Sequence, residues 1–437
     1  MKIISKTTLL LLVLISTNIF SQNDKITVYF NKWVDNNASS IVDAQRVIDI
    51  NDTLIAYIDR AESSIDFCMY NNNLTQVVTA LNNAYDRGVS VRYIYDDDSY
   101  NSALSGLNSN INSIHNVSSG IMHNKFLVID VETPEKTFLI TGSVNSTYTN
   151  IFEDYNNLVI IQDNEIALTY KDEFNEMWGS TDLTPNTSNA KFGSAKSDNT
   201  QHTFNVNGTD IEVYFSPSDG VTSKIENTIN SADNSLYFAL LYFTRDDLAD
   251  AVITKHNAGV EIKGLIEEID EAWGSEYQNL FDNGVNVHSF LEEPGMLHHK
   301  YAIVDYNSSN SDPIVLTGSH NWSTSAETKN DENTIIIHDL FVANEFYEEF
   351  TSRFNQVSGI NDLESLNNIV INENSNSINI SSVSVIKLEI YDISGKLLKN
   401  NISGKKITIN KNEFNNGIYL IKISNKEYSK TIKFIKN

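Results

Sequence analysis

The feature that most constrains this chain is a short pattern of polar residues that occurs twice. The pattern His-x-Lys-x-x-x-x-Asp is formed by His123, Lys125 and Asp130 and again by His298, Lys300 and Asp305. Each copy is followed, at nearly the same spacing, by Gly-Ser-x-Asn, which contributes Ser143 and Asn145 in the first copy and Ser319 and Asn321 in the second. A double match with the same sequel is not accidental, so we interpret the two copies as two parts of one site.

The residues around each pattern predict its chemistry. Apolar side chains alternate after both histidines, as in a buried strand, and a His and a Lys two positions apart point to the same face of a strand. An imidazole can attack phosphorus or transfer a proton near neutral pH, and an ammonium group neutralises a non-bridging oxygen. The Ser hydroxyls and Asn amides at the next turns are expected to add phosphate-binding donors. The pattern therefore favours a phosphodiester substrate, with one repeat supplying a nucleophile and the other an acid.

The duplication extends beyond the motifs. Residues 26–30 recur as 211–215, and residues 61–67 recur as 232–238. Strand patterns alternate with helical patterns in both halves, which predicts an α/β fold made of two repeated α/β/α units that form a pseudo-dimer. A final helix near 164–178 and another near 340–355 are expected to close the two units.

Composition and patterning divide the chain further. We predict a secretory signal peptide over 1–22, because its apolar run is too short for a comfortable membrane span; a permanent anchor is the alternative. The first repeat is assigned to 23–186 and the second to 209–363. The segment 187–208, rich in Ser, Asn, Thr and Lys, is predicted to be an exposed linker. The last segment, 364–437, is predicted to form a small β-sandwich.

The paired motif resembles that of the phospholipase D superfamily over residues 26–355. The resemblance implies a phosphohistidine intermediate, formed by one His while the other protonates the leaving alkoxide, with no metal or other cofactor. By motif position His123 would be the nucleophile and His298 the general acid/base, although the reverse assignment stays open. Lys125, Lys300, Asp130 and Asp305 complete the expected catalytic set, and in the family the Asp tends to be structural.

The resemblance also implies a carboxylate, after each Gly-Ser-x-Asn turn, that holds a ring nitrogen of the histidine. In the second repeat Glu332 is expected to orient His298. The first repeat departs from the family pattern, and Asp154 is the expected counterpart there, with Glu153 as the alternative.

Two further histidines fall at unspecified positions of the motifs. His299 and His320 are therefore expected to be structural. A zinc site from His298 and His299 is improbable, because adjacent residues on a strand face opposite ways and the one Cys, Cys68, is distant in the sequence.

The tail, residues 364–437, resembles the C-terminal sorting domain of the type IX secretion system of Bacteroidetes. That resemblance implies the type IX machinery as a partner and export through the periplasm and outer membrane, to the cell surface or the medium. A carbohydrate-binding sandwich is the alternative, but the basic, aromatic-poor strands offer no platform for stacking sugars.

Charge tilts the choice of substrate. The chain has 31 basic and 57 acidic residues, a net charge of −26, although its tail is basic. A field of this sign disfavours non-specific binding to nucleic acid and to anionic membranes, while zwitterionic head groups are tolerated. An acidic surface that only solubilises the protein is the alternative. The single Cys excludes an internal disulfide.

The leading hypothesis is a secreted phospholipase D-type phosphodiesterase that hydrolyses phospholipid head groups. It is expected to be a monomer with an internal pseudo-dimer and no membrane span after signal cleavage. A secreted, metal-independent nuclease of the same superfamily is the alternative, so nucleic acid is a possible substrate. The apolar residues Met122, Met296 and Leu297, which directly precede the histidines, favour the lipid. A third hypothesis is a catalytically silent surface-binding protein, which the intact motifs disfavour.

Overall fold

The computed structural model describes residues 22–97, 100–116, 118–291, 293–308, 311–358, 370–373, 377–393, 395–424 and 429–436. The predicted signal peptide, except for its last residue, lies outside the described residues. Within these ranges no helix combines the length and the apolar character that a membrane crossing needs.

The first half is a seven-stranded mixed sheet with helices on both faces. Its strand order is β1-β7-β6-β5-β2-β3-β4. The strands are β1 (Ile26–Phe30), β2 (Ser64–Met69), β3 (Ser90–Tyr95), β4 (Asn112–His115), β5 (Lys125–Ile129), β6 (Phe138–Gly142) and β7 (Asn157–Ile161). Apolar residues of α1 (Ile50–Arg60) and α2 (Thr75–Asp86) share one core with one face of this sheet. Those of α3 (Asn164–Trp178) share a different core with the other face.

The second half repeats this arrangement with one additional edge strand. Its order is β12-β11-β10-β13-β14-β15-β9-β8. The strands are β8 (Thr203–Val206), β9 (Thr209–Ser216), β10 (Ser235–Leu240), β11 (Glu261–Ile266), β12 (Asn286–Ser289), β13 (Lys300–Val304), β14 (Ile314–Gly318) and β15 (Glu332–His338). The helices are α4 (Val221–Ser231), α5 (Asp246–Asn257), α6 (Tyr277–Asp282), α7 (Thr324–Thr328) and α8 (Leu340–Val357).

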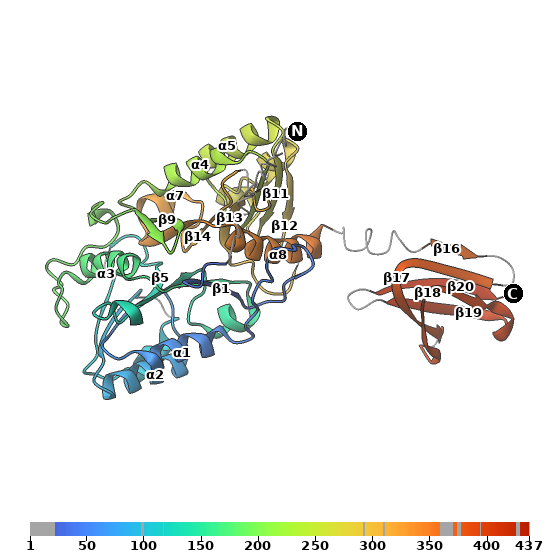
Figure 1. Ribbon diagram of the computed structural model, residues 1–437, viewed down its shortest axis with the longest axis horizontal. Helices are drawn as coiled ribbons and strands as arrows, with labels where there is room; N and C mark the ends of the chain where they lie inside the picture. Colours follow the sequence, from blue (N-terminus) through green and yellow to red (C-terminus); the bar gives the residue numbers. More distant parts are fainter. Residues whose placement is uncertain are drawn as a thin grey trace, which may run out of the picture.

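The two halves share one core. Residues of both sheets, of α3 and of α8 belong to the same buried apolar cluster, whereas α4 and α5 pack with their own sheet on its other face. Figure 1 shows α8, in orange, where the two halves meet. Both α3 and α8 begin at an aspartate, Asp163 or Asp339, whose carboxylate accepts two amide hydrogens of the first turn. The predicted pseudo-dimer of α/β/α units is confirmed.

The segment 187–208 is not the exposed linker that its composition predicted. It contains β8, and its Lys196 is buried between the halves. The Lys196 ammonium forms an ion pair with Glu173 of α3 and lies 3.3 Å from Asp331, just before β15. Composition was misleading here because a charged side chain such as Lys196 can be buried when carboxylates from other parts of the chain pair with it.

The tail forms one five-stranded antiparallel sheet. Its strands are β16 (Val370–Glu373), β17 (Ser377–Asp392), β18 (Leu397–Asn410), β19 (Gly417–Ser424) and β20 (Ser429–Lys436). The long strand β17 pairs with β16 over its first part and with β19 over its last part. Alternate apolar residues of both parts meet in one core, which includes Ile380 and Ile421.

Candidate active site

Backbone hydrogen bonds hold each motif histidine against the opposite half. The amide of His123 donates to the carbonyl of Asp331 at 2.9 Å, and the amide of Asp331 donates to the carbonyl of Ile121 at 2.9 Å. The second histidine has the equivalent pair of bonds. The amide of Tyr155 donates to the carbonyl of Met296 at 2.8 Å, and the amide of His298 donates to the carbonyl of Tyr155 at 3.0 Å. These two equivalent pairs of backbone hydrogen bonds join the loop before each histidine to the opposite half.

Two glycines permit this close approach. A Cβ atom on Gly120 would lie 2.0 Å from the carbonyl oxygen of Lys329, and one on Gly295 would lie 2.1 Å from that of Glu153. Gly295 also has a φ of +87°, which favours glycine. The loop before each histidine therefore needs a glycine where it crosses to the other half.

Each histidine ring is hydrogen-bonded by a residue from the other repeat. Nδ1 of His123 lies 2.7 Å from Oε2 of Glu332, and Nδ1 of His298 lies 2.9 Å from Oδ1 of Asn156. Since each oxygen accepts, each Nδ1 carries the proton and Nε2 keeps its lone pair. The prediction that Glu332 orients His298 is thus wrong, because Glu332 binds the histidine of the first repeat.

The strand register shows that Asn156 and Glu332 are equivalent residues. Gly142 pairs with Leu158, and Gly318 pairs with Thr334, so each residue lies two positions before the partner of the motif glycine. The first histidine is therefore paired with a carboxylate and the second with a neutral amide. The chain could have shown this, because the spacing from Ser143 to Asn156 equals that from Ser319 to Glu332.

The predicted orienting residue Asp154 does not bind a motif histidine. Its Oδ1 accepts the amide hydrogen of Met296 at 3.1 Å, and its Oδ2 accepts from the side chain of Asn150 at 2.6 Å. It stabilises the loop before His298 instead. The alternative, Glu153, contributes its carbonyl to the close contact at Gly295, and its side chain is exposed.

The motif serines are turned away from a phosphate site. The hydroxyl of Ser143 donates to Oδ1 of Asn156 at 2.8 Å and accepts from the amide of Asn157 at 3.1 Å. Ser319 accepts from the amide of Asn333 at 3.0 Å and hydrogen-bonds Glu332. Burial raises the pKa of the Glu332 carboxyl, and this hydrogen bond opposes the rise. Both serines are fully buried. The prediction that they bind phosphate is wrong; they brace the residues that hold the histidines.

The two motif asparagines differ in what they can donate. The side-chain nitrogen of Asn145 is committed to Oδ1 of Asn150 at 2.9 Å. Asn321 makes no side-chain hydrogen bond to a described residue that would occupy its amide, and its Oδ1 is buried without a partner. The Asn321 amide therefore keeps both hydrogens for a ligand such as a phosphate oxygen, whereas that of Asn145 has one left.

The two motif lysines form a buried cationic pair. The ammonium of Lys125 donates to the carbonyl of His123 at 2.6 Å, and that of Lys300 donates to the carbonyl of His298 at 2.7 Å. Burial lowers the pKa of Lys125 to about 7. Burial and the charge of Lys125 also lower the pKa of Lys300. Two ammonium groups that have lost their hydration and repel each other form a strong site for an anion. A bound anion offsets both the cost of desolvation and the repulsion.

Burial also lowers the pKa of both histidines. The charges of Lys125 and Lys300 act in the same direction on each ring. The charge of His123 further lowers the pKa of His298. Both rings are therefore neutral at pH 7 in the absence of substrate, each with a lone pair on Nε2.

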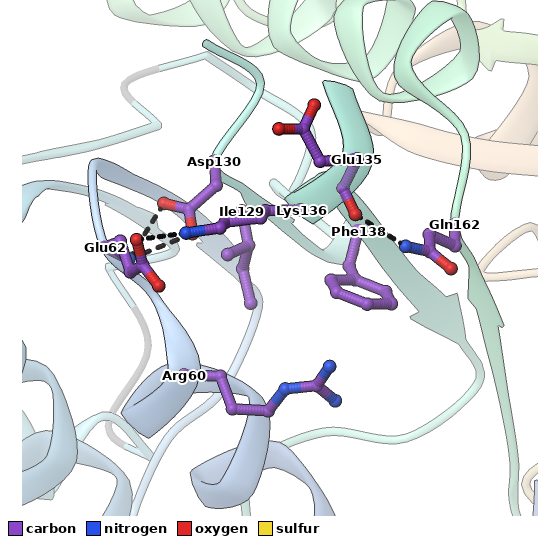
Figure 2. A pocket seen from close by; sticks show the side chains of 8 residues that line it. All are labelled: Arg60, Glu62, Ile129, Asp130, Glu135, Lys136, Phe138 and Gln162. Atoms are coloured by element: carbon purple, nitrogen blue, oxygen red, sulfur yellow. Dashed lines mark hydrogen bonds and ion pairs between the residues drawn. The ribbon is translucent and has the colours of Figure 1, made fainter. Parts of the chain in front are cut away.

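The motif aspartates lie at the other end of their strands. Asp130 accepts from the amides of Ser63 at 2.7 Å and Ser64 at 3.0 Å, and Asp305 accepts from the amide of Ser235 at 2.7 Å. Figure 2 shows Asp130 beside Glu62 and Lys136 in a surface pocket. Asp130 directly follows β5, whereas His123 precedes the other end of that strand. The strand separates Asp and His by roughly 20 Å at about 3.3 Å per residue. They anchor the strand ends, which agrees with the structural role that the resemblance implied and not with a place among the catalytic residues.

The two remaining histidines differ in their partners. Nδ1 of His299 lies 3.1 Å from the side-chain nitrogen of Asn157, and its Nε2 lies 3.2 Å from Glu349. His320 is buried, and neither of its ring nitrogens is hydrogen-bonded by a described residue, although Nε2 lies 3.7 Å from Oε2 of Glu327. Burial lowers its pKa to about 4. His299 therefore occupies the structural network that the sequence predicted for it.

The possible metal ligands lie outside the histidine site. In the part of the chain that the structure describes, the one group of three possible ligands is Asp198, His202 and Asp219. Nε2 of His202 already lies 3.0 Å from Asp198. This group shares no residue with the histidine site.

Sequence reasoning also missed two carboxylates that shape the loops. Asp96 accepts the amide hydrogen of Met122 at 2.7 Å, and Glu267 accepts that of Leu297 at 2.9 Å. Each follows a parallel strand, β3 or β11, at the edge where the histidine loops cross. Their positions after equivalent strands of the repeat were the available signal.

Comparisons with known proteins agree with this geometry. A family model described as cardiolipin synthase, PLD-like domain, matches residues 54–178 and 225–357, and the model of the secretion system C-terminal sorting domain matches 372–437. A phospholipase D of Rickettsia conorii is 36% identical over 144 residues, which are 33% of this chain and 68% of that protein. A mitochondrial cardiolipin hydrolase of Chlamydomonas reinhardtii is 31% identical over 29% of this chain and 55% of its own length. The matched part of this chain thus spans little more than half the length of some curated relatives.

Solved structures extend the comparison. The phospholipase D family member Nuc of Salmonella typhimurium is 28% identical, covers 34% of this chain and 96% of its own, and has a TM-score of 0.30. Polyphosphate kinase of Porphyromonas gingivalis is 12% identical, covers 70% of this chain and 45% of its own, and has a TM-score of 0.50. The second likeness shows a shared fold and nothing more.

Proposed function

The chain belongs to the phospholipase D-like family, and we propose that it is an exported phosphodiesterase that hydrolyses the head-group ester of phospholipids through a phosphohistidine. One observation carries the proposal: each half of the fold hydrogen-bonds the histidine ring of the other half, and a buried lysine follows each histidine by two residues. That set provides a nucleophile, a proton carrier and a cradle for a phosphate anion.

His123 is the proposed nucleophile. Its Nδ1–H donates to Glu332, so the Nε2 lone pair can attack phosphorus. The new P–N bond leaves a positive charge on the ring, and the carboxylate at 2.7 Å neutralises that charge. An amide could not do so, which favours His123 over His298 for the covalent step.

His298 is the proposed proton carrier. When the substrate anion binds, Nε2 of His298 takes up a proton, which it then gives to the departing alkoxide as the P–O bond breaks. The neutral ring next removes a proton from water, the resulting hydroxide attacks phosphorus, and the P–N bond to His123 breaks. Asn156 keeps the Nδ1–H of His298 in place during both transfers.

Lys125 and Lys300 are the proposed ligands of the non-bridging oxygens, with the amide of Asn321. Each ammonium spends one hydrogen on a backbone carbonyl and retains two for the phosphate. The binding of an anion also restores the protonated form of both lysines, since the opposite charge favours it.

Phospholipid is the substrate class that the surroundings favour. The net charge of −26 opposes a polyanion, and Met296, two residues before His298, exposes 42% of its surface beside the site. The names of the curated relatives, cardiolipin hydrolase and phospholipase D, point to the same class.

The test exposes the purified protein to phosphatidylcholine vesicles and, separately, to plasmid DNA, in EDTA. We expect choline release without nicking, and loss of that release in His123→Ala and in His298→Ala. His256→Ala, on α5, is the matched histidine control and should retain full activity. Nicking without choline release would replace this proposal by a metal-independent nuclease.

We also propose where the protein acts. The sorting domain at 372–437 and the predicted signal peptide favour export by the type IX machinery, with the active chain at the cell surface or outside the cell. The domain limits 23–186, 209–363 and 364–437 are proposed from the two repeated sheets and the separate sheet of the tail, with 187–208 as a partly buried connection that contains β8. A monomer is proposed because both halves of the site are in one chain.

A further inference from the structure

We propose that four exposed apolar side chains beside His298 form a surface that inserts into the interface of a zwitterionic phospholipid bilayer. They are Trp33, Tyr148, Phe152 and Met296, with exposed fractions of 47%, 57%, 37% and 42%, and are called the His298 rim here. This inference rests on the proposed lipid substrate, because it states how a soluble protein would reach that substrate in a membrane.

Tyr155 joins the members of the His298 rim. Its backbone is bonded to Met296 on one side and to His298 on the other. The ammonium of Lys32 lies 5.3 Å from the centre of the Tyr155 ring and donates to the carbonyl of Phe152 at 2.8 Å. The rim is thus contiguous with the loop that carries a catalytic residue.

Three further contacts complete the rim. The rings of Tyr148 and Phe152 pack with their centres 4.9 Å apart. The guanidinium of Arg353 lies over Tyr155, 4.7 Å from the ring centre, and donates to the carbonyl of Trp33. Specific contacts therefore hold residues from three distant parts of the sequence together. Apolar residues scattered singly over a surface are not connected in this way.

The side-chain types suit a bilayer interface. Trp and Tyr prefer the depth of the lipid head groups, where the ring is buried and the polar tip stays wet, while Phe and Met contribute apolar area. Burial of such side chains by lipid would provide binding energy that water-exposed rings in a monomeric protein do not use.

The charges around the rim match a zwitterionic surface better than a polyanion. Lys32 and the exposed Arg46 are cationic, and Glu153, between Phe152 and Asp154, is an exposed anion. Charges of both signs can pair with the phosphate and ammonium groups of phosphatidylcholine. A nucleic acid that stacked its bases on these rings would bring phosphates toward Glu153 and toward a strongly acidic protein.

The tryptophans of the chain make a direct test possible. Of its four, Trp178 and Trp322 are fully buried, so only Trp33 and Trp273 can meet an added membrane. In Trp273→Phe the only exposed indole is Trp33, and in Trp33→Phe it is Trp273. We expect brominated phosphatidylcholine vesicles to quench the fluorescence of Trp273→Phe and to leave that of Trp33→Phe nearly unchanged.

The functional readout is the ratio of choline release from vesicles to hydrolysis of soluble bis(p-nitrophenyl) phosphate. We expect Tyr148→Ser combined with Trp33→Ser to lower this ratio about tenfold, from the lost burial of two aromatic rings. Phe281→Ser, which removes an aromatic of similar exposure on α6, is the matched control and should not change it.

The outcomes separate this inference from the proposed function. Quenching of Trp33 without choline release would support the rim and contradict the lipase activity. Choline release with no quenching of Trp33, or with quenching of Trp273 instead, would overturn the rim and leave the activity. A change of Trp33 fluorescence with plasmid DNA but not with vesicles would also overturn it, in favour of a nucleic acid surface.

Discussion

Glu332 of the second half accepts a hydrogen bond from His123 of the first half at 2.7 Å. The equivalent residue of the first half, Asn156, binds His298 of the second at 2.9 Å. Each half therefore orients the histidine of the other, and neither contains a complete site. The exchange is symmetric in position but unequal in charge. This inequality is the basis of our proposal that His123 forms the covalent bond and that His298 transfers the proton.

Glu332→Gln should lower kcat/KM on bis(p-nitrophenyl) phosphate by about 100-fold or more, because a neutral amide cannot offset the charge of the phosphohistidine. The measurement is steady-state kinetics on folded protein, with circular dichroism to confirm the fold. Glu153→Gln, an exposed carboxylate nearby, is the control. A loss of less than threefold in Glu332→Gln would remove Glu332 from the mechanism.

Asn156→Asp should move the alkaline limb of the pH profile to higher pH by about one unit. A general acid must be protonated, so the rate falls as pH rises through the pKa of His298, and a carboxylate in place of the amide raises that pKa. The measurement is kcat/KM for choline release from phosphatidylcholine between pH 5 and 9, because that leaving group needs a proton. An unchanged limb would show that His298 is not the acid.

Sulfate, whose charge is constant near neutrality, should inhibit less well as pH rises. Lys125, with a pKa of about 7, loses its proton in the free enzyme above that pH, and the inhibition constant should then increase about tenfold per pH unit. In Lys125→Met this slope should flatten while inhibition weakens at all pH values. A wild-type constant that is flat from pH 6 to 8 would contradict a lysine-based anion site.

Gly295→Ala should impair catalysis more than stability. A Cβ there would lie 2.1 Å from the carbonyl oxygen of Glu153 and would displace the loop that carries His298, which should lower kcat by about 100-fold. Gly88→Ala is the control, because Gly88 also has a positive φ but has open space around it. It should lose about 1 kcal/mol of stability and no activity. Equal activity of the two variants would mean that the crossing is not tight.

Lys196→Met should destabilise the protein by about 3–5 kcal/mol, because it leaves the buried carboxylates of Glu173 and Asp331 without their cation. Burial acts to lower the pKa of Lys196, but the charges of these two carboxyls outweigh it and raise that pKa. Urea unfolding gives the free energy. Lys191→Met, at a largely exposed lysine that pairs with Glu176, is the control and should lose less than about 1 kcal/mol.

Local patterns predicted the fold and the two histidines, because they act over a few residues. Alternating apolar residues located β5 and β13, and helical periodicity located α3 and α8 within a few residues. The duplication then required the two motifs to meet. All of this information lies within short windows of the chain.

Partners across the two halves were not predictable in this way. Glu332 is far from His123 in sequence, and its pairing depends on how the halves cross, so a local alignment assigned it to His298. Composition predicted an exposed segment over 187–208, but Lys196 within it is buried because its two carboxylate partners come from other elements. The role of Ser143 was not predicted because its hydroxyl donates to Asn156. Asn156 looks like an ordinary asparagine in the sequence, and the strand register shows that it is equivalent to Glu332.

The most direct test of two rings acting on one phosphorus is to trap the covalent intermediate with bis(p-nitrophenyl) phosphate. Its p-nitrophenolate leaves without a proton, so His298→Ala should still form the P–N bond but should not hydrolyse it. We predict a burst of one p-nitrophenol per protein in His298→Ala, a phosphoryl adduct that mass spectrometry locates on His123, and neither in His123→Ala. An adduct in His123→Ala, or no adduct in either variant, would contradict the account.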